Sequence, residues 1–320
     1  MAGRVDVSVV IAAWNCAGTL EAALDTALGQ DGVSVEAIVA DDCSKDETAA
    51  RARARGDADA RVRLVQNPVN AGPAAARNRA IDAARGEWIA VLDADDAYAP
   101  GRLRRMVALG AEKGADAVLD NLREVDETGA PISNAPFLSL EAPEQWDLSR
   151  WAMDNRVFEA RRCTGFLKPL IRRGFLEAQG LRYREAMRNS EDYALIADLL
   201  VRGGTVWALP EPGYLYTRWS GSTSHRYKAA ELQAVVDFAR DFEATHGADQ
   251  DPDTRGALRR YRLAIENAAA LNDGVMALQS RRPLGFLRAI AGRPRALPLF
   301  GKWLGEVIGK RLPGRRSAGT

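Results

Sequence analysis

Three carboxylates follow directly on an apolar run in this chain of 320 residues. The run spans residues 88–92, and the acids are Asp93, Asp95 and Asp96. Carboxylates this close repel one another, so a cation would stabilise them, and hard oxygen ligands favour Mg²⁺ or Mn²⁺. The alternative is a solvated acidic turn that caps a helix after Pro100. The segments around this run decide between the two.

Two earlier apolar segments also end in small polar or acidic residues. Residues 5–13 are followed by Asn15, and residues 35–40 are followed by Asp41 and Asp42. Apolar runs of this kind predict strands that are buried on both faces, as in a parallel sheet. The carboxyl ends of such strands meet at one sheet edge, where open α/β sheets bind ligands. We therefore expect these polar groups to converge where a nucleotide would lie.

Helical and strand patterns alternate over the first hundred residues. Apolar spacing predicts helices over 19–28, 46–55 and 73–84, with a short strand at 62–66. The resulting β-α-β-α-β-α-β order predicts parallel pairing. The chain holds neither Gly-x-Gly-x-x-Gly after its first strand nor Gly-x-x-x-x-Gly-Lys-Ser/Thr. This counts against a Rossmann dehydrogenase and a P-loop enzyme.

The middle of the chain shows weaker patterns. We expect a strand at 117–119, a loop or hairpin region over 120–143, a helix within 144–160 and a strand at 166–171. An apolar helix follows residues 189–193, and Ser190 is its expected N-cap.

Composition limits the class of protein. The chain has 44 basic and 43 acidic residues, so it carries no nucleic-acid signature. Three cysteines are too few for a disulfide framework and indicate a reducing compartment. Arg4 and Asp6 interrupt the start, so we expect no secretory signal. Without a run of about 18 apolar residues we expect no spanning helix, and hence a cytoplasmic protein.

The tail has its own character. Residues 281–316 hold ten Lys or Arg and one acid, Glu306, interleaved with leucines and aromatics. Such a segment suits an amphipathic surface on the anionic inner face of the plasma membrane. The alternative is a basic helix that packs on the body of the protein. We expect the peripheral membrane contact to involve residues 281–320.

Taken together, these segments resemble the family 2 glycosyltransferases with the GT-A fold. The resemblance covers residues 5–225, and the order and spacing of its five segments make it specific. Residues 120–122 and the length are also similar to bacterial succinoglycan-type exopolysaccharide glucosyltransferases. The five matching segments are residues 9–15, 39–44, 70–78, 92–96 and 191–192.

The chain departs from the family pattern at two positions near the expected binding site of the nucleotide base. Ala12 stands where the family commonly has proline, and Trp14 stands where it has Tyr or Phe. The resemblance implies an α/β fold with a mostly parallel central sheet flanked by helices. Residues 1–225 would form the catalytic domain, with a nucleotide-sugar half at about 1–115 and an acceptor half at about 116–225. Residues 226–320 would form a helical extension.

The resemblance implies a nucleotide-diphosphate sugar donor, for which UDP-glucose is the first candidate. Asp95 would ligate Mn²⁺ or Mg²⁺, and Asp93 would hold the ribose and share the ion. Asp42 would accept a hydrogen bond from the uracil N3–H, although a turn with Asx-type bonds is the alternative. Asn15 could simply close its turn, and Arg77 could pair with an acid instead of reaching phosphate. The other residues expected at the donor are Ala12, Asp41, Asn70, Gly72 and Ala94.

The resemblance further implies transfer with inversion to a hydroxyl of a glycan or lipid-linked oligosaccharide. Asp192 would be the general base and Glu191 would help to position it, whereas helix capping is the alternative. Tyr216, Arg218 and Ser222 resemble a mobile segment that closes over the diphosphate. Ordinary edge-strand residues are the alternative for these three.

Two other functions fit parts of the pattern. A sugar-nucleotide pyrophosphorylase shares the layered architecture and the acidic metal site, but it would need a glycine-rich, basic loop after the first strand. Residues 14–18 supply neither feature. A non-catalytic nucleotide-sugar-binding module is the third possibility, and the intact acids Asp93, Asp95 and Asp192 argue against it.

Overall fold

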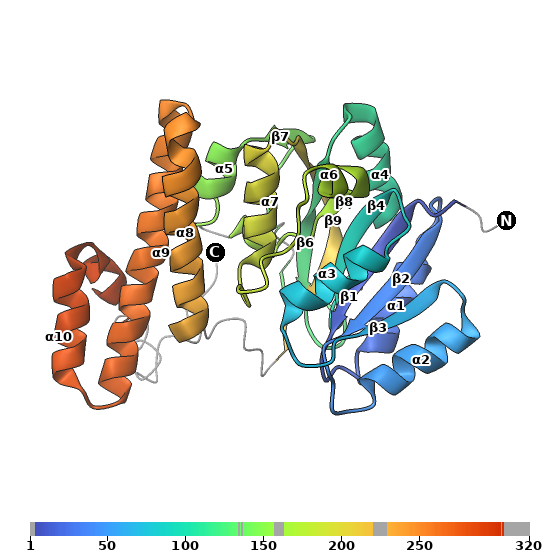
Figure 1. Cartoon of the computed structure of the whole chain (residues 1–320), viewed down its shortest axis with the longest axis horizontal. Helices are drawn as coiled ribbons and strands as arrows, with labels where there is room; N and C mark the ends of the chain where they lie inside the picture. Colours follow the sequence, from blue (N-terminus) through green and yellow to red (C-terminus); the bar gives the residue numbers. More distant parts are fainter. Residues whose placement is uncertain are drawn as a thin grey trace. The chain divides into compact units, whose positions relative to one another are not determined.

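The computed structural model describes most of the chain, in two compact units (Figure 1). The first unit holds the described residues up to 155 and those from 163 to 219, and the second holds Arg156 and those from 229 onward. The described residues are 4–133, 135, 137–156, 163–219, 229–301 and 303.

A mixed sheet of nine strands forms the centre of the first unit. The strands are β1 (Val7–Ala13), β2 (Val35–Asp41), β3 (Val62–Gln66), β4 (Trp88–Asp93), β5 (Ala97–Tyr98), β6 (Ala117–Val125), β7 (Glu144–Trp146), β8 (Leu170–Arg172) and β9 (Val206–Thr217). Their order is β3-β2-β1-β4-β8-β6-β9-β5, with β7 paired to β9. The first four strands pair in parallel, whereas β8 runs antiparallel to β4 and β6.

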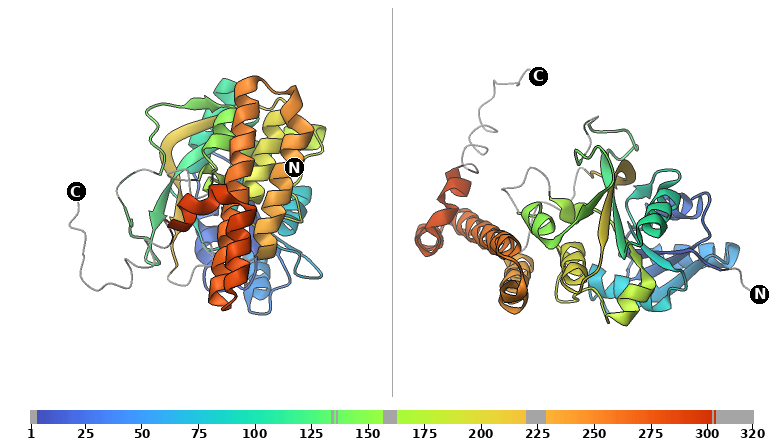
Figure 2. Two further views of the ribbon diagram at one scale, coloured as in Figure 1. Left: turned by 90° about the vertical axis from the view of Figure 1, so that its left-hand side faces the viewer. Right: turned by 90° about the horizontal axis from the view of Figure 1, so that it is seen from above.

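Helices cover both faces of this sheet. They are α1 (Leu20–Leu28), α2 (Thr48–Ala58), α3 (Pro73–Ala83), α4 (Arg102–Lys113), α5 (Leu148–Met153), η1 (Thr164–Phe166), α6 (Arg173–Ala178) and α7 (Glu191–Val201). α3 packs on β1 and β2, and α4 packs on β6 and β9. In the right-hand view of Figure 2, α4 and α7 lie on opposite sides of the strands.

The register of the parallel strands sets the position of their carboxyl ends. Ala13 of β1 lies opposite Asp41 of β2, and Ala12 lies opposite Asp93 of β4. β2 is buried along its whole length, as expected for an apolar run between two helical layers. The residues that follow β1, β2 and β4 therefore emerge at one edge of the sheet.

Two elements predicted in the middle of the chain are shorter than expected. The helix predicted within residues 144–160 is the short α5, because β7 takes up Glu144–Trp146 and Asp147 then caps the helix by accepting from the Arg150 N–H at 2.7 Å. Residues 157–162 lie outside the described part. Residues 166–171 do not form one strand, because η1 extends to Phe166 and β8 begins only after Pro169. Proline has no N–H to donate to a sheet ladder, which fits this late start.

The strand predicted at 117–119 is longer than expected and replaces the first part of the predicted loop. β6 continues to Val125 through a register shift at Asn121. There the Asn121 side-chain amide donates to the carbonyls of Leu138 at 2.8 Å and Pro210 at 3.0 Å. The side chain thus bonds the Pro210 carbonyl at the irregular part of the ladder and ties the loop at Leu138 to it.

The second unit is helical. Its elements are α8 (Ala229–His246), η2 (Gly247–Asp249), α9 (Pro252–Gln279), α10 (Pro283–Gly292) and η3 (Pro294–Ala296). A small core that includes Leu271 and Phe300 holds α10 and η3 against α9. Among the described helices, none has both the length and the apolar character needed to traverse a bilayer.

Candidate active site

The carboxylate of Asp42 fastens the loop that leads into α3. It accepts hydrogen bonds from the N–H groups of Ala71 at 2.9 Å and Gly72 at 2.7 Å, and from the Asn67 amide at 2.8 Å. Asn70 donates to the Asp42 carbonyl at 3.2 Å. Gly72 has a φ of 96°, which favours glycine. Three of the roughly four acceptor positions of this carboxylate are therefore used inside the protein.

Asn15 and Asp41 hold the neighbouring turns together. The Asn15 side chain accepts from the Lys45 N–H at 2.8 Å, and the Asn15 N–H donates to Ser44 Oγ at 3.0 Å. Asp41 accepts from the Ser44 N–H at 3.3 Å and from Gln66 Nε2 at 3.2 Å. The loops after β1 and β2 are thus cross-linked at the sheet edge, through Asn15 bonds to the second loop and not through bonds within its own turn.

A buried network of three carboxylates and two cations joins β4 to α7. Arg77 of α3 lies 2.5 Å from Asp93 Oδ1 and 2.5 Å from Glu191 Oε1. Lys168 Nζ lies 2.9 Å from Asp93 Oδ2 and 2.7 Å from Asp192 Oδ2. Arg77 also approaches Asp192 to 3.7 Å. The structure therefore brings Arg77, Asp93, Glu191 and Asp192 together and adds Lys168 to them.

Opposite charges control ionisation in this network. Burial alone would lower the pKa of Lys168 and Arg77, but the Asp192 and Asp93 charges outweigh it and raise both above their usual values. Burial alone would raise the pKa of Asp93, but Lys168 and Arg77 hold it below its usual range. Lys168, Arg77 and Asp93 therefore stay charged at neutral pH.

Tyr183 supplies a further contact to Asp192. Its hydroxyl donates to Asp192 Oδ1 at 2.9 Å, while Asn78 bonds the Tyr183 backbone at both its N–H and its carbonyl. Burial and the Asp192 charge raise the pKa of Tyr183 well above its usual value, so the hydroxyl remains a donor. Ser190 occupies the N-cap position of α7, but it makes no side-chain cap bond and has a φ of 60°. The predicted capping role of its side chain is wrong.

The other two acids after β4 differ in their surroundings. Asp96 is buried and accepts from the Tyr214 hydroxyl at 2.7 Å and the Thr217 N–H at 2.8 Å. Burial and the nearby acids hold the pKa of Asp96 well above its usual range. Asp95 is exposed, and no ion pair joins it to a described side chain. Partial desolvation and the Asp93 charge raise the pKa of Asp95.

The donor set around β4 fits a cation that a substrate helps to hold. Within the described ranges, no group of three or more His, Cys, Asp or Glu is arranged to bind a metal by itself. Mg²⁺ is commonly bound through one or two carboxylates together with substrate phosphates. Asp95 presents a carboxylate that pairs with no described side chain, and Asp93 keeps 27% of its side chain accessible although both oxygens contact cations.

The remaining predicted residues lie around this edge. Ala12 is the register partner of Asp93, and Ala94 is buried in the turn after β4. At the end of β9, Tyr216 meets Phe166 edge-on with ring centroids 6.0 Å apart. Arg218 Nε lies 3.1 Å from a carboxylate oxygen of Glu124. Ser222 of the predicted lid lies outside the described residues.

Sequence reasoning missed Lys168 and Tyr183. Lys168 carried one signal, because it is a lone charge inside the apolar run 166–171 and a buried lysine needs an acidic partner. Tyr183 carried none, since its role depends on contacts with Asn78 and Asp192 that no local pattern reveals.

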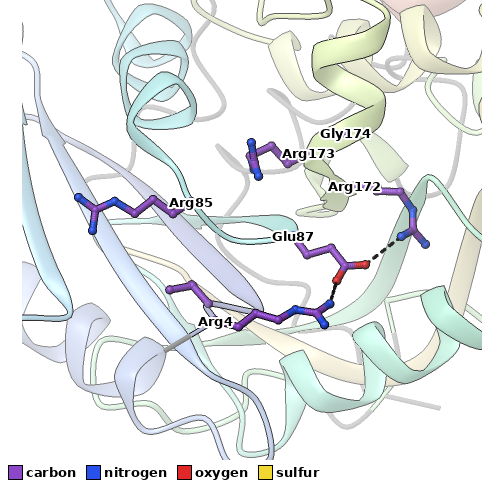
Figure 3. Close-up of a pocket in the computed structure, with 7 residues that line it drawn as sticks. Arg4, Arg85, Glu87, Arg172, Arg173 and Gly174 are labelled. Atoms are coloured by element: carbon purple, nitrogen blue, oxygen red, sulfur yellow. Dashed lines mark hydrogen bonds and ion pairs between the residues drawn. The ribbon is translucent and has the colours of Figure 1, made fainter. Parts of the chain in front are cut away.

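A separate cavity of about 530 Å³ lies at the opposite edge of the sheet, next to the start of β1 and β4. Figure 3 shows Arg4 and Arg172 directed at Glu87, while Arg85 points away from them. Arg173 donates to the Gly86 carbonyl at 2.7 Å. These guanidinium groups do not converge, so the cavity is a weaker anion site than its arginines suggest.

The chain matches a known protein family. The family model described as glycosyl transferase family 2 matches residues 8–175. The chain belongs to this family. It is 39% identical over 284 residues to the succinoglycan biosynthesis protein ExoO of Rhizobium meliloti (strain 1021). That match covers 89% of this chain and 74% of ExoO. The predicted family resemblance, including its succinoglycan branch, is confirmed.

Two solved structures share the fold of this glycosyltransferase. S. aureus TarS 1–349 in complex with UDP-GlcNAc has a TM-score of 0.61 at 16% identity, covering 91% of this chain and 92% of TarS. The mannosyltransferase PcManGT from Pyrobaculum calidifontis, in complex with GDP-Man and Mn²⁺, has a TM-score of 0.58 at 18% identity. The latter covers 96% of this chain and 81% of PcManGT. The predicted GT-A fold is confirmed.

Proposed function

We propose that this family 2 glycosyltransferase is an inverting hexosyltransferase. It transfers a sugar, with glucose as the first candidate, from a UDP-sugar to a hydroxyl of a glycan or lipid-linked oligosaccharide. The observation that carries the proposal is the network that ties Asp93 at the strand edge to Asp192 and Glu191 of α7. The name of ExoO and the UDP-GlcNAc in the TarS structure support a role in exopolysaccharide or cell-surface polysaccharide synthesis.

The donor would bind at the carboxyl edge of β1, β2 and β4, within residues 1–115. Asp42 has about one acceptor position left, which suits a single donor such as the uracil N3–H. Asn15, Asp41, Asn70 and Gly72 would shape the nucleoside slot. Ala12 and Ala94 would leave room beside it. The acceptor would bind against residues 116–225, and residues 226–320 would form the helical extension.

Arg77 would act through the acids and not through phosphate. Arg77 is 2% exposed, and its guanidinium contacts Asp93 and Glu191, so a phosphate could reach it only after those contacts break. This geometry supports the role in which Arg77 pairs with an acid over the role in which it binds phosphate.

Asp95, with Asp93 sharing, would hold Mn²⁺ or Mg²⁺ against the diphosphate. A divalent ion bound there neutralises the negative charge that grows on the leaving diphosphate. Asp95 is the stronger candidate because its carboxylate is exposed and pairs with no side chain in the described ranges, whereas both Asp93 oxygens contact cations.

Asp192 would be the general base. As the acceptor oxygen bonds to the anomeric carbon, the carbon–oxygen bond to UDP breaks on the opposite face and the hydroxyl proton passes to Asp192. Attack from that face inverts the anomeric carbon, which has oxocarbenium character in the transition state. Glu191, held by Arg77, would keep the first turn of α7 in place.

Tyr216, Arg218 and Ser222 would close over the diphosphate and exclude water. Closure requires Arg218 to exchange Glu124, now 3.1 Å away, for a phosphate oxygen. A charge-assisted bond of the same kind would then replace the one lost.

Family membership favours transfer over a pyrophosphorylase reaction, the alternative considered from sequence. The intact acids Asp93, Asp95 and Asp192 favour an active enzyme over a binding module.

A thermal-shift panel of nucleotide sugars, with and without Mn²⁺, tests donor and metal together. At 100 times its dissociation constant a ligand adds about 2.7 kcal/mol, or about 5–11 °C in Tm for a domain of this size. We expect UDP-glucose with Mn²⁺ to give this shift and GDP-mannose to give none. Absence of a shift with every UDP-sugar would refute the proposal.

We also propose that the protein is cytoplasmic and contacts the inner face of the plasma membrane through its tail. Leu284 and Leu287 of α10 are 70% and 58% exposed on a helix with no buried residue. Residues 281–301 contain five arginines and no acid. Arg293 pairs with Glu266 of α9, and the other four arginines lie beside the exposed leucines, a combination that fits an anionic bilayer surface.

A further inference from the structure

Lys168 bridges the two ends of the proposed reaction site. Its ammonium contacts Asp93, proposed to bind the donor, and Asp192, proposed to accept the proton. The two carboxylates come from β4 and α7, and the lysine comes from the segment between η1 and β8. No other described cation lies within 3 Å of both acids.

The backbone of Lys168 is held firmly. Its carbonyl accepts from Arg102 at 2.7 Å, and Arg102 is bound by both oxygens of Asp120. The next residue, Pro169, accepts from the Val91 N–H of β4 at 3.3 Å. A lysine whose main chain is fixed on this side can hold its ammonium at one place between the acids.

The contacts of Asp93 and Asp192 do not depend on Lys168 to the same degree. Without Lys168, Asp93 would keep Arg77 at 2.5 Å, whereas Asp192 would keep only the Tyr183 hydroxyl and Arg77 at 3.7 Å. Removal of Lys168 therefore weakens the contacts of Asp192 more than those of Asp93. Any donor group that binds Asp93 must also share that carboxylate with Lys168.

We propose that Lys168 is a positioning residue that orients the Asp192 carboxylate and links its position to donor binding at Asp93. This inference rests on the proposed function. Removing the lysine should reduce turnover far more than donor affinity, because misplacing a reacting group by about 1 Å can slow a reaction about 100-fold.

The test compares K168M with K113M, which removes a surface lysine that pairs with Glu112 at 2.8 Å. Donor binding is measured by calorimetry with UDP-glucose and Mn²⁺, and turnover by release of UDP with water as the acceptor. For K168M we expect kcat to fall about 30- to 100-fold and the donor Kd to change less than about threefold. K113M should match the wild-type protein in both measurements.

A double-mutant cycle separates positioning from general damage. If Lys168 acts through Asp192, K168M should change kcat less than about threefold when D192N is already present. The double variant also removes one buried charge of each sign, so it should fold even if K168M does not. Two results would overturn the proposal. One is a double variant whose loss of kcat equals the product of the losses in K168M and D192N, and the other is a donor Kd that rises in K168M by the same factor by which kcat falls. Failure of the wild-type protein to bind or cleave any UDP-sugar would instead refute the proposed function.

Discussion

Replacement of Asp192 by asparagine is the most direct test of the reaction chemistry. The carboxylate accepts from Lys168 at 2.7 Å and from the Tyr183 hydroxyl at 2.9 Å. Asparagine has the same shape, so its oxygen can accept from Lys168 while its amide donates to the oxygen of Tyr183. Lys168 keeps Asp93 at 2.9 Å in either case. The variant should therefore fold, with a loss of about 1.5–3 kcal/mol for one charged hydrogen bond.

The effect on turnover should be much larger than the effect on donor binding. An amide cannot take the acceptor proton, and a positioned general base contributes about 10²- to 10⁴-fold. The expected loss in kcat corresponds to about 3–5.5 kcal/mol of barrier. The donor Kd should change less than about threefold, because Asp192 contacts the donor half only through Lys168 and Arg77.

Asp198→Asn is the matched control on the same helix. Asp198 is 5% exposed and accepts from Arg184 at 2.9 and 2.8 Å. The substitution D198N therefore removes a comparable buried charge outside the network of Arg77 and Lys168. Turnover is measured as UDP release, and folding as the Tm of each variant. D198N should keep turnover within about twofold of the wild-type value. Unchanged turnover in D192N, or an equal loss in D198N, would refute Asp192 as the base.

Three further perturbations follow from the structure. Asp95→Asn should abolish the Mn²⁺-dependent part of the Tm increase given by UDP-glucose, and a persisting increase would exclude Asp95 as the ligand. Arg102→Met leaves the buried carboxylate of Asp120 without its cation and should lower the free energy of unfolding by about 3–5 kcal/mol in urea titrations. A loss below about 1 kcal/mol would contradict the importance of this pair. The pair of changes Leu284→Glu and Leu287→Glu should abolish sedimentation with anionic vesicles. Ile132→Glu, at another exposed apolar residue, should leave it unchanged.

The pattern of apolar residues fixed much of the first half of the chain. Runs such as 35–40 could only be strands buried on both faces, and their order dictated parallel pairing through the intervening helices. Because parallel strands end at one edge, Asp42 and Asp93 were placed on that edge from local patterns alone. Specific residues then matched a family motif whose fold the comparisons confirm.

Tertiary structure decided what each polar group touches. The partners of Arg77, namely Asp93 and Glu191, come from different parts of the chain, and so do those of Lys168. Ion pairing and burial depend on distances across the fold, which hydrophobic periodicity does not encode. The break of residues 166–171 into η1 and β8 has the same origin, since that geometry carries Lys168 to the two acids. The sequence thus determined where the acids gather, and only the packed chain determined which cations hold them.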